Sequence, residues 1–181
     1  MSNKFNEIGH VSTEGGPILI GDYKVITKWN GIDTDDYDKL IETPEEDFMY
    51  KIADKTVAVW NPEGGSFIGI HSNHQDKYTF IKSYTKYEED YKYIGAVGRN
   101  EEIIGDVEIF SNTLLILYAP ESGVLLEPLK ENSITRLKGD LAFEESVLSI
   151  PVTNGTYRLV TDFVFGSETL HQAKRLVITK L

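Results

Sequence analysis

The chain has 181 residues, no cysteine and a formal net charge of −11, from 18 basic and 29 acidic residues. This length suits one domain, or two tightly joined halves, with a sizeable core. The lack of cysteine excludes a disulfide framework and a thiolate metal site, and the acidity argues against partners such as nucleic acid or an anionic membrane surface.

The N-terminal part of the chain predicts a cytoplasmic protein that enters its fold through a strand. The first residues are polar, without the apolar run of a signal peptide, and no window is long enough for a membrane span. Gly15-Gly16-Pro17 leads into a short apolar run, Ile18–Asp22, which is typical of a strand between turns. The next run, Tyr23–Trp29, alternates loosely and favours a second strand.

An unusual concentration of charge follows. Between Asp33 and Asp47 there are eight carboxylates and one lysine; we call this stretch, Asp33–Asp47, the acidic segment. Thr34 or Asp35 is a suitable N-cap for a helix with acidic residues in its first turn, and Pro44 ends that helix. The segment therefore predicts a short helix with a solvated acidic face.

Helical spacing also predicts which side of this helix is buried. Tyr37, Leu40 and Ile41 lie at positions i, i+3 and i+4, so they share one face, which we expect to pack on the core.

The middle of the chain has the residue pattern of β-strands. Four runs are rich in β-branched and aromatic residues, and turn signals separate them. The expected strands are Phe48–Ile52, Thr56–Trp60, Ser66–His71 and Lys77–Tyr84.

The C-terminal part predicts two hairpins and a final strand. Ser111-Asn112 separates the strand-like runs Asp106–Phe110 and Thr113–Tyr118. Asn154-Gly155, in the middle of Ser149–Val160, is a strong signal for a tight hairpin turn. Arg175–Leu181 forms the last expected strand.

These elements predict an α+β fold, predominantly antiparallel β with a few short helices. We expect two β-rich halves, residues 1–98 and 99–181, either as separate units or as one continuous domain.

Few patterns in the chain point to catalysis or to metal binding. His71, His74 and Asp76 could form a metal site if they converged, but a plain polar loop is the favoured interpretation. A calcium loop starting at Asp33 fails, because its sixth and twelfth positions hold Asp38 and Pro44 rather than Gly and Glu. We therefore expect neither an enzyme nor a cofactor.

A cluster of tyrosines occurs in a charged stretch of the chain. Tyr84, Tyr87, Tyr91 and Tyr93 fit either a protein interface or the edge of the core.

Three short motifs resemble bacterial immunity protein family 21 of polymorphic toxin systems. Gly15-Gly16-Pro17 with its aliphatic triplet, Trp29-Asn30-Gly31 and Asp36-Tyr37-Asp38 follow one another in the order and at the spacing of that family, and they cover Gly15–Asp38. Gly155–Leu159 is similar to a strand in the C-terminal part of such proteins. The resemblance implies a cytoplasmic antitoxin that binds its cognate effector toxin and blocks it by occlusion, without catalysis.

The charge pattern agrees with a basic toxin such as a nuclease, because complementary fields steer association. The carboxylates expected to bind it are Asp33, Asp35, Asp36, Asp38, Glu42, Glu45, Glu46 and Asp47. Two alternatives remain open: a small metal-dependent enzyme using His71 and His74, and a structural β accessory module that pairs through a strand edge.

Overall fold

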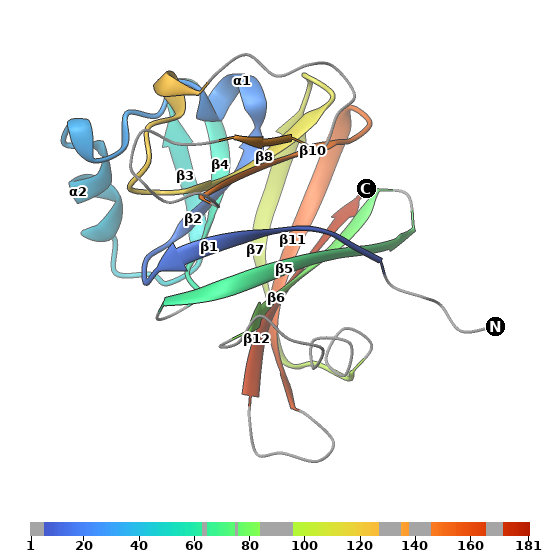
Figure 1. The fold of residues 1–181 in the computed structure, drawn as a ribbon. Coiled ribbons are helices and arrows are strands. Elements are labelled where there is room, and N and C mark those ends of the chain that lie inside the picture. Colours follow the sequence, from blue (N-terminus) through green and yellow to red (C-terminus); the bar gives the residue numbers. More distant parts are fainter. Residues whose placement is uncertain are drawn as a thin grey trace.

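The computed structural model describes residues 6–62, 65–74, 76–83, 96–126, 135–137, 146–165 and 172–181. Two six-stranded antiparallel sheets pack face to face, and short helices cover the outer side of one of them (Figure 1). The predicted α+β class, with antiparallel β dominant and a few short helices, is confirmed.

Each sheet takes its strands from distant parts of the sequence. The first sheet has the spatial order β1 (Asn6–Glu14), β5 (Gly65–His74), β6 (Lys77–Ser83), β12 (Gln172–Lys180), β11 (Gly155–Phe165) and β7 (Arg99–Ile109). The second sheet has the order β3 (Phe48–Ile52), β4 (Lys55–Trp60), β2 (Ile18–Asp22), β8 (Thr113–Tyr118), β10 (Val147–Pro151) and β9 (Thr135–Leu137). Both sheets combine strands from residues 1–98 with strands from residues 99–181, so the two ranges share one core.

The second sheet is buried on both faces. On β2, Ile18 and Ile20 point into the space between the sheets, whereas Leu19 points to the helical layer. That layer contains α1 (Tyr23–Ile26), η1 (Gly31–Asp33), α2 (Asp36–Ile41) and η2 (Gly123–Leu125), where η marks a single 3₁₀ turn. Burial on both faces explains why these strands read as continuous apolar runs rather than as an alternating pattern. Among the described residues, the longest helix has six residues, far short of a membrane span.

The expected strand at Tyr23–Trp29 is wrong, because this stretch begins with helix α1. The side chain of Asp22 accepts a hydrogen bond from the Lys24 amide, a helix N-cap, and Val25 and Ile26 are buried against the sheet. A four-residue helix is too short for its period to be distinguished from loose alternation in the sequence.

Both expected hairpins are also wrong. The residues around Ser111-Asn112 connect β7 in the first sheet to β8 in the second, and those around Asn154-Gly155 connect β10 in the second sheet to β11 in the first. The two connections lie side by side, since the Asn112 amide donates to the Asn154 side chain over 2.7 Å and the Val152 amide donates to the Asn112 carbonyl over 3.0 Å. These hydrogen bonds join the corners of the sandwich instead of closing hairpins.

Several strands differ from the sequence prediction, and β7, for example, begins at Arg99 rather than at Asp106. The polar stretch Asn6–Glu14 forms β1, which was not expected, and β5 continues through His74 instead of ending at His71. The predicted strand Arg175–Leu181 is confirmed within β12, with Leu176 and Ile178 in the core. The tyrosine cluster lies within 84–95, outside the described residues.

The Asp22 carboxylate joins three parts of the fold. Besides capping α1, its Oδ2 accepts hydrogen bonds from the Phe110 amide, the Ser111 amide and the Ser111 hydroxyl, each over 2.8 Å. Asp22 is only 1% exposed. Hydrogen bonds to a buried charged group are the strong ones, so this carboxylate fixes the crossing from the first sheet to the second.

Replacing this acceptor should destabilise the protein. We expect Asp22→Asn to lower the free energy of unfolding by about 3 kcal/mol, since an amide oxygen cannot accept all of these bonds and the amide NH₂ faces other donors. Urea denaturation of the purified variant measures the change. Asp54→Asn, in the exposed turn between β3 and β4, is the control and should change stability by less than about 0.5 kcal/mol; equal losses in both variants would contradict this role.

A second carboxylate, Asp76, ties the β5–β6 turn to the end of β10. Thr153 donates to it through its hydroxyl over 2.9 Å, and the Tyr157 hydroxyl lies at the same distance. Burial raises the pKa of Asp76, but the hydrogen bonds from Thr153 and Tyr157 and the charge of Lys180 outweigh burial and hold this pKa below its ordinary value.

The lowered pKa predicts a pH-dependent contribution to stability. Because the unfolded chain binds this proton more readily, the contribution is complete above the unfolded pKa of about 3.9 and is lost as pH falls through the lower folded value. We expect the difference in free energy of unfolding between the native protein and Asp76→Asn to be largest near pH 7 and to shrink below about pH 4. Asparagine tolerates the positive φ of 60° at this position, so urea denaturation across the pH range isolates the charge, and a constant difference would refute it.

Candidate functional site

The acidic segment covers the outer side of the second sheet near β3 and β4 (Figure 1). Leu40 of α2 is fully buried, and the half-buried Tyr37 packs on the same cluster. The predicted helix is confirmed, ending before Pro44, with Asp35 at its N-cap position. The side-chain cap comes instead from the Thr34 hydroxyl, which accepts from the Asp36 amide over 3.2 Å.

The chain leading into the segment is held by contacts with the loop after β8. Trp29 is buried and its indole N–H donates to the Ala119 carbonyl over 2.7 Å, so it anchors this stretch in the core. Gly31 has a φ of +63°, and a Cβ there would lie 2.4 Å from the Pro120 carbonyl oxygen. Only glycine allows this approach, so the Trp-Asn-Gly motif has a structural role in placing the acidic segment.

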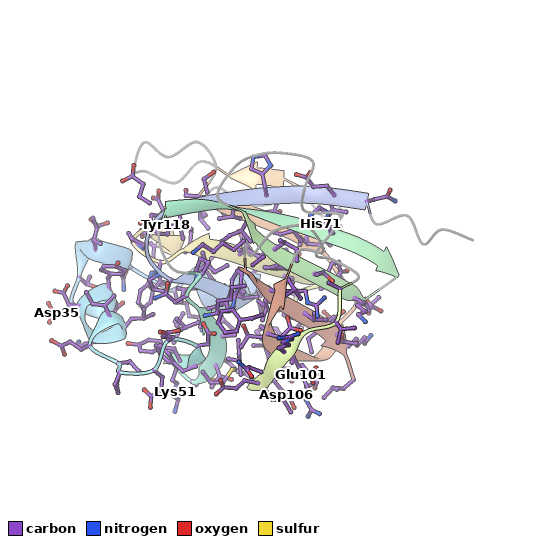
Figure 2. All side chains as sticks on the ribbon, turned by 90° about the horizontal axis from the view of Figure 1, so that it is seen from below. Asp35, Lys51, His71, Glu101, Asp106 and Tyr118 are labelled. Atoms are coloured by element: carbon purple, nitrogen blue, oxygen red, sulfur yellow. The ribbon has the colours of Figure 1, made fainter. Side chains whose placement is uncertain are left out.

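The structure separates the eight predicted carboxylates into exposed and engaged groups. The exposed ones are Asp33, Asp35, Asp38, Glu42, Glu45 and Glu46. In Figure 2, Asp35 lies at the outer edge of the molecule, well away from Glu101 and Asp106. Its ion pair with Lys39 spans 4.0 Å between two exposed side chains, a geometry that contributes little to stability.

Asp36 and Asp47 are half-buried and bind other parts of the chain. Asp36 accepts a hydrogen bond from the Asn30 side chain over 2.9 Å. Asp47 lies 2.7 Å from the Lys174 ammonium and accepts from the Asn61 amide over 2.8 Å. Burial raises the pKa of Asp47 and outweighs the lowering by Lys174 and Asn61. Both carboxylates therefore hold the segment in place.

Ile41 is the residue that the helical pattern misplaced. The pattern put it on the buried face with Tyr37 and Leu40, but its side chain is 52% exposed. Ile32, in η1, is 50% exposed. The acidic segment and its entry thus present large aliphatic side chains as well as carboxylates.

A pocket of about 300 Å³ opens where the acidic segment meets the first sheet. Its lining residues are Glu45, Glu46, Asp47, Asn100, Glu102, Thr161, Phe163 and Lys174. The strand residues belong to β7, β11 and β12, which are neighbours in the first sheet. Of the four acids in this set, the sequence pattern identified Glu45, Glu46 and Asp47 as candidate binding residues, but not Glu102 or the four other lining residues.

Lys174 forms the wall of this pocket although only 5% of the residue is exposed. Its ammonium is bound by Asp47, lies 3.8 Å from Glu46, donates to the Asn61 carbonyl over 2.7 Å and sits 5.9 Å from the centre of the Trp60 ring. One signal in the sequence pointed to it: Lys174 has the same strand parity as Leu176 and Ile178, which face the core.

The histidine alternative gains no support from the geometry. His71 is buried, and burial lowers its pKa despite the charge of Glu7, while Asp76 is engaged with Thr153 and Tyr157. The side chain of His74 lies outside the described residues. Within the described part of the chain, no three His, Asp or Glu side chains are grouped to hold a metal ion.

Comparison with known proteins identifies no relative: no family model, no curated protein and no solved structure matches this chain. The fold and the geometry of the acidic segment are therefore the basis for assigning a function.

Proposed function

We propose that this chain is a bacterial immunity protein that binds a basic cognate toxin in the cytoplasm and blocks it by occlusion. The resemblance of Gly15–Asp38 to immunity protein family 21 suggests the class of protein. The observation that carries the proposal is the mixed surface of the acidic segment and its entry, where exposed Ile32 and Ile41 accompany exposed carboxylates.

This mixture is the chemistry of a protein-binding surface. Apolar side chains that become fully buried supply much of the affinity at an interface, and charged residues around them supply orientation and partner choice. Ile32 and Ile41 would supply the apolar contacts of such a surface, and the exposed carboxylates its charge.

The way the segment is attached supports binding by occlusion. Trp29, Gly31 and Leu40 anchor it to the second sheet, and Asp47 holds its end through Lys174. A surface that is already ordered loses little conformational entropy on binding. Its field would attract a basic protein at long range, and nuclease toxins are of this kind because their substrate is a polyanion.

The toxin-binding residues are accordingly a subset of those that the sequence suggested. We assign direct contact to Asp33, Asp35, Asp38, Glu42, Glu45 and Glu46. Asp36 and Asp47 support the surface from behind.

The test begins with identification of the partner. A tagged chain is used to capture proteins from a lysate of the native host at low salt, and captured proteins are identified by mass spectrometry. We expect a basic protein that stops the growth of a laboratory host when expressed alone and allows growth when this chain is co-expressed. Capture without such rescue would count against an immunity function.

Charge reversal then tests the surface itself. We expect Asp33→Lys combined with Glu42→Lys to slow association with the captured toxin about tenfold at low salt, with a smaller effect as salt is raised. Surface plasmon resonance measures the rate. Both residues are exposed and outside the first turn of α2, so stability should change by less than about 0.5 kcal/mol.

A matched control separates local from overall charge. Asp54→Lys combined with Glu101→Lys makes the same change in net charge at two exposed positions outside the segment. If this control slows association as much as the first variant, the acidic segment is not the contact surface.

A further inference from the structure

The pocket beside the acidic segment has a strong excess of negative charge. Four of its eight lining residues are carboxylates, Glu45, Glu46, Asp47 and Glu102, and one is a cation. Lys174 lies 2.7 Å from Asp47 and 3.8 Å from Glu46. One cation against four carboxylates leaves an excess of three negative charges around the space. Such a pocket would repel phosphates and other anions.

The wall of the pocket already binds an organic cation belonging to the chain itself. The Lys174 ammonium is held by a carboxylate, a backbone carbonyl and the face of Trp60. The space in front of it offers two of these kinds of group, namely carboxylates and the aromatic Phe163. Carboxylates together with an aromatic ring are a favourable setting for ammonium and guanidinium groups.

The volume of the pocket and the positions of its carboxylates indicate which kind of cation it can bind. A volume of about 300 Å³ is at the lower end for small-molecule sites, enough for one long side chain. The described carboxylates do not converge as metal ligands do. A guanidinium carries five N–H donors in a fixed plane, so it can bind acceptors that lie apart on opposite walls.

We propose that this pocket binds the guanidinium of an arginine side chain presented by a protein partner. Glu102 on β7 and Glu45 and Glu46 on the acidic segment accept its hydrogen bonds, and Phe163 packs against its stem. Identification of that partner as the toxin rests on the proposed function; the affinity of the pocket for arginine does not.

A small probe tests the pocket without any toxin. N-acetyl-arginine amide is titrated into the ¹⁵N-labelled full chain, with N-acetyl-citrulline amide as its neutral analogue of the same shape. We expect saturable NMR shifts at Asn100, Glu102, Thr161 and Phe163 with a Kd of about 1 mM, and no saturation with citrulline. Equal shifts with both probes, or shifts elsewhere on the molecule, would overturn the proposal.

Neighbouring glutamates provide matched variants. Glu102→Gln should weaken binding of the arginine probe about threefold to fivefold. Glu101→Gln, the next residue on β7, points to the other face of the strand, does not line the pocket and should leave the Kd unchanged. Both side chains are exposed, and the NMR spectrum itself reports whether each variant is folded. Equal weakening by the two variants would show general attraction to an acidic protein rather than a site.

The two proposals can fail separately. If the arginine probe binds and no toxin is found, the pocket stands and the immunity function falls. If a toxin binds and the probe does not, the function stands and the pocket is not part of its recognition.

Discussion

The burial of the second sheet on both faces is the constraint on which the rest of this structure depends. Its central strands, β2, β4 and β8, have apolar side chains on each side. One side packs on the first sheet, and the other must be covered by something else, because exposing it would leave a large apolar surface in water. The short helices and the acidic segment provide that cover.

This requirement explains why the acidic segment has two different faces. Leu40 and Tyr37 point inward because the sheet has to be covered, and the helix leaves its other positions for solvent. Those positions can vary without affecting the core, so they are where a binding surface can be placed at little cost to stability. Ile41 is the exception to this division, since it is apolar and yet 52% exposed.

The sequence predicted strands and helix α2 well and connections poorly. Strands β2 and β8 contain the continuous apolar runs Ile18–Ile20 and Leu114–Tyr118, so local composition suffices to find them. The hairpin at Asn154-Gly155 failed because a turn signal specifies a change of direction and not the sheet that the chain enters next. Asn154 instead binds the Asn112 amide, a contact between residues distant in the chain that no local pattern contains.

The charged residues of the candidate site were likewise only partly predictable from the sequence. Composition located the acidic segment, and helical spacing placed α2, but neither could show that Asp47 would turn inward to Lys174, far along the sequence. The half-buried and the exposed carboxylates of the acidic segment differ in their dependence on salt. The Asp47–Lys174 pair is largely shielded from solvent and is screened little by mobile ions, whereas the exposed carboxylates of the acidic segment are screened within about 8 Å at physiological salt. Raising the ionic strength should therefore weaken the attraction of a basic partner while leaving the segment attached to the sheet. The exposed carboxylates that we propose as the binding surface and the contacts that hold this surface in place thus respond separately to salt, so a change in ionic strength would alter the proposed binding without unfolding the protein.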